Sequence, residues 1–130
     1  MTSFVLAFWL HGFVASLFAD ETVAGYAPDG VNWRLIELSG DPFPATATLQ
    51  LLAKGKVTGA GPCNRFSARQ TAPYPWFALT AIAATKRACP DLELEAEFFG
   101  ALETMTLSEV SGTLLILTDD AGDQMVFEAE

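Results

Sequence analysis

The sequence predicts a β-rich α+β domain, built from an antiparallel meander of strands and one main helix. In the C-terminal third, short β-forming runs are separated by turn residues at a spacing of about ten residues, which is typical of successive hairpins. Only the segment that opens at Pro90-Asp91 combines helix-start residues with apolar residues every three or four positions. Strands and helices do not alternate along the chain, so a parallel sheet with crossover helices is not indicated.

The first half of the domain contains several short strands. Trp33 to Leu38 alternates apolar and polar residues, which places Trp33 and Leu35 on a buried side. Lys54-Gly55 is typical of a hairpin turn, and Trp76 to Leu79 is a further apolar run. The expected strands are Trp33 to Leu38, Thr46 to Ala53, Lys56 to Thr58 and Arg65 to Thr71.

The helix is expected from about Asp91 to Glu103. Pro90 suits a helix start, and the acidic side chains of Asp91 and Glu93 suit the positive end of the helix dipole. The apolar stripe that predicts the helix consists of Leu94, Phe98, Leu102 and Met105. The strands expected after it are Met105 to Val110, Thr113 to Thr118 and Gln124 to Glu128, with turns at Ser111-Gly112 and at 120–123.

The N-terminus has the features of an export signal. The 16 residues from Phe4 to Ala19 contain no Asp, Glu, Lys or Arg. This run is shorter than the roughly 20 residues of a membrane span and has the length of a signal-peptide core. Cleavage is expected after Ala19, with Ala24 as a second candidate; an uncleaved anchor is the alternative, because no basic residue precedes the run. We therefore expect a periplasmic or cell-envelope protein with no stable transmembrane span after processing.

The remaining 111 residues fit one domain. Residues 20–32 contain Gly25, Pro28, Asp29 and Gly30, and this composition predicts a flexible lead-in. Residues 33–130 form the expected domain, and a hydrophobic content of 51% supplies enough apolar side chains for its core.

The charges are unevenly distributed. A formal net charge of −9 argues against sequence-independent binding of nucleic acid and against adhesion to an anionic membrane. All seven basic residues lie between Arg34 and Arg87, whereas eleven of the sixteen acids lie between Asp91 and Glu130. The first interpretation is structural: two solvated surfaces, or mutual neutralisation of the charges within one fold. The second is functional: an acidic face that binds a cation or a basic partner.

The two cysteines, Cys63 and Cys89, predict a disulfide. In an oxidising compartment such a pair is usually bridged, and closing this loop would stabilise the fold by about 3 kcal/mol. Cys63 lies in the stretch GAGPCNRFSA, which lacks the Gly-Lys-Ser/Thr of a phosphate-binding loop. Gly59 and Gly61 are therefore interpreted as turn residues with positive φ before a strand.

The composition excludes several kinds of catalytic site. The only histidine, His11, lies in the segment that is expected to be removed, so neither a Ser-His-Asp triad nor a Cys-His pair can form in the mature chain. Two cysteines without a histidine do not supply the ligands of a zinc site. The acidic turn from Asp119 to Asp123 lacks the spacing of a calcium-binding loop. We expect no catalytic residue, no metal and no cofactor.

Arg65 and Arg87 are the candidate ligand-binding residues. Each lies two positions from a cysteine, so a bridge between Cys63 and Cys89 would bring them near each other. They could hold a small anion. The alternative is that both side chains point to solvent or pair with the acidic helix.

Five short motifs resemble, in their order and spacing, the META domain family, also called HslJ-like after a bacterial heat-inducible protein. They are Trp33-Arg34-Leu35 with Gly40; Cys63-Asn64-Arg65-Phe66; Thr85-Lys86-Arg87-Ala88-Cys89; Glu95 and Phe98 leading to Leu102; and Leu114 to Leu117 with Gly122 and Phe127. Two positions depart from the family pattern: Pro62 stands where a small residue is usual, and Ala68 where a glycine is common.

The resemblance implies a curved, meander-type sheet or partial barrel with the helix packed on it. It also implies a bacterial envelope setting, a link to stress or antibiotic tolerance, and no established catalytic residues. Cys63, Asn64 and Cys89 would have structural roles, with Asn64 bonding backbone groups of its turn. Many exported relatives are lipid-anchored, but this sequence has no cysteine for such an anchor.

Three functions follow as hypotheses. The first is a non-enzymatic envelope domain whose partner, a small molecule or an envelope protein, is unknown. The second is a domain that binds a small anion or a hydrophobic compound near Arg65, Arg87 and neighbouring aromatic residues. The third is a thiol-redox protein, which is the least favoured because the cysteines do not form a Cys-x-x-Cys motif.

Overall fold

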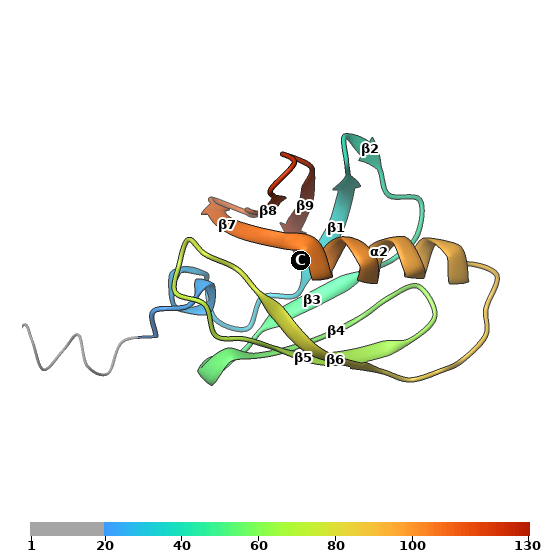
Figure 1. Ribbon diagram of the computed structural model, residues 1–130, viewed down its shortest axis with the longest axis horizontal. Helices are drawn as coiled ribbons and strands as arrows, with labels where there is room; N and C mark the ends of the chain where they lie inside the picture. Colours follow the sequence, from blue (N-terminus) through green and yellow to red (C-terminus); the bar gives the residue numbers. More distant parts are fainter. Residues whose placement is uncertain (1–19) are drawn as a thin grey trace, which may run out of the picture.

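An antiparallel sheet curls into a half-barrel, and one helix packs on it (Figure 1). The computed structural model describes residues 20–130; the expected export signal at 1–19 lies outside them. The strands are β1 Trp33–Leu38, β2 Asp41–Pro42, β3 Thr48–Leu51, β4 Lys56–Ala60, β5 Arg65–Gln70, β6 Leu79–Ala84, β7 Met105–Ser111, β8 Leu114–Asp119 and β9 Gln124–Ala129. The helices are α2 Leu92–Thr104 and two short 3-10 turns, η1 Val23–Tyr26 and η2 Ala53–Gly55.

Strand β1 joins the two halves of the sheet. The strand order is β6-β5-β4-β3-β1-β9-β8-β7, and β2 pairs with β1. Within each half the strands follow one another as hairpins, which confirms the predicted meander. Because β1 lies between β3 and β9, the first strand of the domain pairs with the last, in a register that sets Trp33 opposite Ala129.

The core fills the concave side of the sheet. Trp33 and Leu35 of β1 and Phe127 of β9 are at most 1% exposed, as the alternation of apolar and polar residues predicts. Helix α2 adds Phe98 and Leu102, which are fully buried. The Phe98 ring meets the Phe66 ring of β5 edge to face, with 5.9 Å between their centroids. Burying each of these large apolar side chains contributes about 1.5–3 kcal/mol, which holds α2 on the sheet.

The half-barrel is partly closed where its two edge strands, β6 and β7, approach each other. The segment before β6 crosses to β7: the Phe77 N–H donates to the Thr106 carbonyl at 2.9 Å, and the Ser108 N–H donates to the Pro75 carbonyl at 2.7 Å. Trp76 and Leu107 form an isolated bridge at the same place. Helix α2 packs beside β6 and runs directly into β7. An opening remains between α2 and the edge of β6.

Strand β6 is longer than the sequence indicates. The predicted apolar run ends at Leu79, whereas the strand begins there and continues to Ala84. Its alternation is masked by small side chains, and Ala81 has a positive φ of 54° at a bulge opposite β5. The bulge shifts the register by one residue, so the buried and exposed positions do not follow a simple period of two.

The lead-in makes more contact with the domain than its turn-rich composition indicates. Val23 is 1% exposed and belongs to the core. The Tyr26 ring stacks on Tyr74 with 4.3 Å between centroids, and the Tyr74 N–H donates to the Glu21 carbonyl at 2.7 Å. Residues 20–26 therefore pack against the seam between β7 and the segment before β6.

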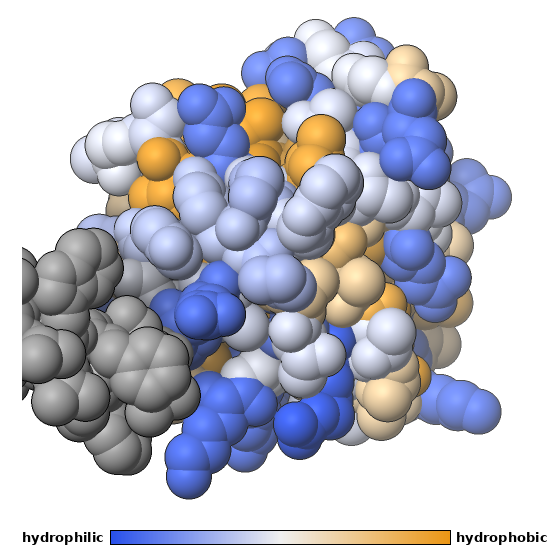
Figure 2. Space-filling model, turned by 60° about the vertical axis from the view of Figure 1, so that its left-hand side comes forward, coloured by the Kyte–Doolittle hydropathy of each residue, from blue (hydrophilic) through white to orange (hydrophobic). Residues whose placement is uncertain are grey.

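The surface is a mosaic on the face that Figure 2 shows. Apolar residues form separate orange patches, and polar residues surround each of them. Within residues 20–130, no helix has both the length and the apolar character that a membrane crossing requires.

Replacement of Phe98 by Ala is predicted to lower the free energy of unfolding by about 3–5 kcal/mol, because it leaves a cavity between α2 and β5. Urea denaturation measures the change. Leu92→Ala is the matched control on the same helix, since Leu92 is 45% exposed, and we expect its effect to stay below about 1 kcal/mol. Equal effects of the two substitutions would contradict the packing of α2 on the sheet.

Candidate functional site

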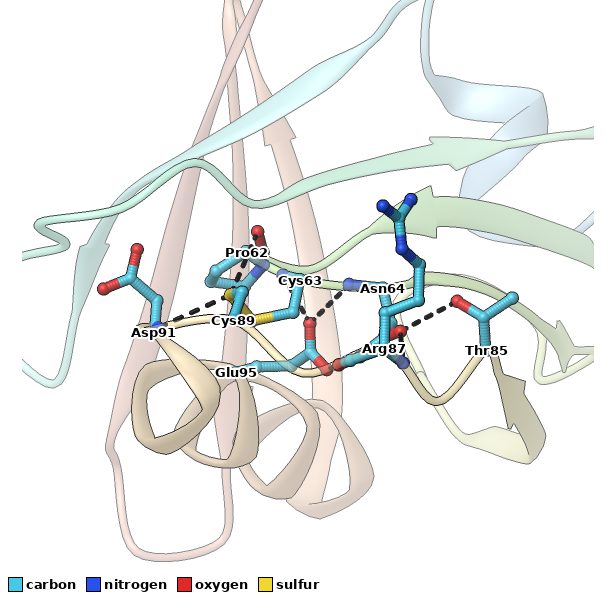
Figure 3. The surroundings of a disulfide bond; sticks show 8 residues. All are labelled: Pro62, Cys63, Asn64, Thr85, Arg87, Cys89, Asp91 and Glu95. Atoms are coloured by element: carbon cyan, nitrogen blue, oxygen red, sulfur yellow. Dashed lines mark hydrogen bonds between the residues drawn. A yellow bond between two sulfur atoms is a disulfide. The ribbon is translucent and has the colours of Figure 1, made fainter.

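A disulfide between Cys63 and Cys89 joins the β4–β5 loop to the β6–α2 loop (Figure 3). The two Cα atoms are 5.6 Å apart, and both residues are half-buried. The predicted bridge is confirmed, and it places the loop of Asn64 beside the first turn of α2.

The side chain of Asn64 uses its full hydrogen-bonding capacity. Its Oδ1 accepts from the Arg87 N–H at 2.6 Å and from the Thr85 hydroxyl at 3.0 Å. Its Nδ2 donates to Glu95 Oε1 at 2.6 Å and to the Arg87 carbonyl at 3.1 Å. An amide offers two donors and two acceptor positions, so all four are taken. The predicted role of Asn64 in bonding backbone groups holds, but those groups belong to the β6–α2 loop and not to its own turn.

The carboxylate of Glu95 binds the same loop from the other side. Its Oε2 accepts the backbone N–H of Cys63 and of Asn64, each at 2.7 Å, while Oε1 accepts the Asn64 side chain. Glu95 is only 5% exposed and lies in the first turn of α2, where the helix dipole favours a negative charge. Within residues 20–130 the single ion pair is the surface contact of Arg34 with Glu130. N–H donors, and not a basic side chain, therefore compensate this buried charge.

Gly61 and Gly59 are required by close packing, which corrects their predicted role as turn residues with positive φ. Neither is among the glycines with positive φ in the described part of the chain. A Cβ atom on Gly61 would lie 2.8 Å from Glu95 Oε2. Gly59 lies within β4, and a Cβ atom there would collide with the Thr48 carbonyl and lie 2.7 Å from the Phe66 ring. Because Gly59 has no side chain, β3 and β5 can pack closely on both sides of β4. Because Gly61 has none, α2 can approach the β4–β5 loop.

Arg65 and Arg87 are neighbours through their backbones, but they do not form one pocket. The Thr85 N–H donates to the Arg65 carbonyl at 3.1 Å, which ties the start of β5 to the loop that carries Arg87. Both residues are exposed. The Arg87 side chain points away from Glu95 (Figure 3), so its backbone serves the cluster while its guanidinium stays outside.

An open groove of about 530 Å³ lies beside this cluster, between the edge of β6 and α2. Ile82, Leu92 and Phe99 supply apolar surface, and Lys86 and Arg87 supply two positive charges. Arg65 does not line it. Of the two predicted arginines, only Arg87 lines the groove. Lys86, which was not predicted from the sequence as a ligand-binding residue, lines it as well.

The hydrogen-bonding roles of Glu95 and Thr85 in this cluster were not predicted from the sequence. Both occur in the motifs that carry the family resemblance, but the apolar stripe was expected to run through Leu94. Leu94 is only half-buried, whereas Glu95, Phe98 and Leu102 form the buried face of α2. An acid on the buried side of a helix is the signal that could have identified the cluster, because a buried carboxylate needs N–H partners.

The cluster offers no free reactive group. The polar side-chain atoms of Asn64 and Glu95 are engaged with each other and with the two loops. No three Cys, His, Asp or Glu side chains within residues 20–130 are grouped as metal ligands require. What the arrangement can do is hold the two loops and the start of α2 in one geometry.

Glu95→Gln is predicted to lower the free energy of unfolding by about 2–3 kcal/mol. The amide oxygen can still accept from Cys63 and Asn64, but the new NH₂ group would face the Asn64 Nδ2 donor. Flipping Asn64 does not help, because its NH₂ would then face the Arg87 N–H. Urea denaturation measures the loss. Glu97→Gln, an exposed change on the same helix, serves as control, and an equal effect of the two would contradict the assigned network.

Comparisons with known proteins identify the family and the fold of this chain. The META domain family model matches residues 27–130. An NMR structure of a protein from Burkholderia xenovorans has a TM-score of 0.62 at 19% identity, covering 90% of this chain and 87% of that one. A crystal structure of a DUF4847 family protein from Bacteroides vulgatus has a TM-score of 0.64 at 11% identity, covering 88% and 96%.

At these identities the two solved structures show a shared fold alone. A comparison with curated proteins finds no match. The family model, in contrast, spans most of the chain, including all nine strands of the described part, α2 and both cysteines. The chain therefore belongs to the META domain family.

Proposed function

We propose that this chain is an exported, non-enzymatic domain of a bacterial cell envelope, which acts by binding and contributes to stress or antibiotic tolerance. The observation that carries the proposal is the engagement of Asn64 and Glu95: the polar groups at the most distinctive motif bind the protein's own loops. Side chains that are engaged in this way are suited to supporting a surface, which favours a binding role over a catalytic role for Asn64 and Glu95.

Export is supported by the disulfide, since structural bridges persist mainly in oxidising compartments. The uncharged run from Phe4 to Ala19 gives the route. N-terminal sequencing of the protein recovered from its native cells tests this part. A mature chain that starts at Asp20 or Gly25 is expected; a cytoplasmic chain that starts at Met1 with two free thiols would contradict it.

The structural role of the motif is tested with Asn64→Ala and with a double Cys63→Ser, Cys89→Ser variant. Removing the bridge is expected to cost about 3 kcal/mol. Removing the Asn64 amide takes away the donor to Glu95 Oε1 and the partners of the Arg87 N–H and carbonyl, and a loss of about 2–4 kcal/mol is expected. Thermal unfolding measures both, next to survival of the deletion strain complemented with each variant.

The two readouts separate the hypotheses. If the motif is structural, each variant is expected to reduce survival under heat or antibiotic in proportion to its loss of folded protein, and no further. A variant with unchanged stability and lost tolerance would show that Asn64 or the cysteines act directly, as a binding or a redox site would require. A wild-type gene that restores no tolerance would contradict the stress link.

Binding of a small amphipathic anion is the second candidate, and the groove between β6 and α2 favours it. Its apolar side, formed by Ile82, Leu92 and Phe99, and its two cations, Lys86 and Arg87, suit a ligand with an apolar body and one acidic group. A thermal-shift screen of organic anions and hydrophobic antibiotics tests it. A ligand that raises the melting temperature of wild type, but not of Lys86→Gln/Arg87→Gln, would support it. The control is Arg34→Gln, and no shift with any compound would count against the groove.

A thiol-redox function has less support. Both cysteines in the described part of the chain are in the bridge, and none is free to resolve a mixed disulfide. Loss of tolerance in the double serine variant at unchanged stability is the outcome that would favour it.

A further inference from the structure

The positive charges of this acidic chain are concentrated in one half of the sheet. Residues 42–90 contain six of the seven basic residues and no Asp or Glu. This segment runs from the end of β2 through β6. The expected neutralisation of the two charge groups within the fold does not take place as ion pairs, since the one pair within residues 20–130 joins Arg34 to Glu130.

Three of these cations lie on the outer face of β4 and β5. Arg65 and Arg69 are exposed and alternate with buried residues along β5, and Lys56 is exposed at the start of β4. In the register of the two strands, Lys56 lies opposite Arg69 and Ala60 opposite Arg65. Thr58 and Ser67 face each other between these pairs. The three cations therefore share one face of the two strands with the small side chains of Thr58, Ala60 and Ser67.

The pairing of Lys56 with Arg69 is unfavourable for the fold. Like charges directly opposite each other on neighbouring strands destabilise a sheet. Nothing in the described part of the chain offsets this repulsion with a carboxylate within ion-pair distance. Arg69 makes only one long contact, donating to the Lys54 carbonyl at 3.4 Å. A surface with this cost and no internal partner is suited to an external anion.

The acidic residues of the same sheet are too distant to cancel this field. Crossing from β5 through β4 and β3, the first acids occur on β1 and β9, which are three and four strand steps away. At a strand spacing of about 4.8 Å these steps amount to roughly 14 and 19 Å. Both exceed the Debye length of about 8 Å at physiological ionic strength. Asp20 and Glu21 precede η1, but neither forms an ion pair with Lys54 or Lys56.

The N-terminal segment enters the domain at the same end of this face. Thr22, Val23 and Ala24 line a small hollow together with Gly55 and Lys56. The uncharged run from Phe4 to Ala19 precedes them directly in the sequence. The start of the described chain therefore lies near Lys56, at one end of this face.

We infer that the outer face of β4 and β5, carrying Lys56, Arg65 and Arg69, docks onto the phosphate groups of an anionic lipid bilayer. The three cations project from one face of two neighbouring strands, so they lie within one Debye length of the bilayer together when this face contacts it. The net charge of −9 opposes such contact only where the acids are near the bilayer, and the acids of β1 and β9 are farther from β5 than one Debye length. The inference goes beyond the proposed function and does not depend on it.

Vesicle co-sedimentation of the full chain, as it is recovered from its producing cells, tests the inference. The two lipid compositions are phosphatidylcholine alone and phosphatidylcholine with 30 mol% phosphatidylglycerol. Any binding through an uncleaved N-terminal run is common to both compositions, so the readout is the gain on the anionic vesicles. Each cation near an anionic surface contributes about fivefold to binding. We therefore expect a gain of more than tenfold at low salt, which falls as sodium chloride is raised.

Charge variants assign the gain to the proposed face. The double variant Arg65→Gln/Arg69→Gln is expected to lose most of the gain on anionic vesicles. The control Arg34→Gln removes a cation of β1 that is paired with Glu130, and it is expected to leave the gain unchanged. Arg69→Gln alone relieves the repulsion from Lys56, so its melting temperature is expected to equal or exceed that of wild type while its binding falls. This combination separates a binding role from a structural one.

Three outcomes would overturn the inference. The first is equal binding to the two kinds of vesicle. The second is an undiminished gain in Arg65→Gln/Arg69→Gln. The third is displacement of the protein from anionic vesicles by polyglutamate or duplex DNA at equal charge concentration, because the face would then favour an acidic protein or a nucleic acid over a lipid surface.

Discussion

The carboxylate of Glu95 is the contact on which the arrangement of this domain depends. It sits at the first turn of α2, where it accepts N–H groups from Cys63 and Asn64 and the side-chain amide of Asn64. A buried carboxylate is stable only when several donors face it. The position of α2 on the sheet and the shape of the β4–β5 loop are therefore determined together, and Gly61 leaves the space for their contact.

The disulfide and the hydrogen bonds stabilise the same junction in different ways. The disulfide between Cys63 and Cys89 lowers the conformational entropy of the unfolded chain, but it does not by itself set the conformation of the two loops that it joins. The bonds of Asn64 to Thr85 and Arg87 specify the native geometry of the β6–α2 loop. Together they give the open side of the half-barrel a fixed border. The groove between β6 and α2 lies on one side of this junction. Strand β5, which carries Arg65 and Arg69, begins on its other side.

Much of the fold could be predicted from local patterns. The alternation in Trp33 to Leu38 and the hairpins after Met105 locate their strands because one face of each is buried and the turns between them are short. Strand β6 could not be located, because Ala81 and the bulge break the alternation. The insertion of β1 between β3 and β9 could not be derived either, since it depends on contacts between residues far apart in the chain.

The site was predictable in its parts and not in its connections. Cysteine count and compartment predict the bridge, and the family motifs contain Asn64 and Glu95. These two side chains meet because α2 packs with Glu95 on its buried face. Sequence periodicity predicted Leu94 on that face, and not Glu95. The net charge was also an incomplete guide. A value of −9 describes the whole chain, whereas residues 42–90 hold six basic residues and no acid.

Amide hydrogen exchange measured by NMR tests the central role of Glu95 most directly. The backbone N–H groups of Cys63 and Asn64 lie in a loop, yet both donate to a buried carboxylate. They should exchange as slowly as the amide of Leu117 in the centre of β8, and lose this protection in Glu95→Ala, which removes the acceptor oxygens. Exchange of Cys63 and Asn64 as fast as that of the exposed Gly112 turn in the wild-type chain would contradict the account.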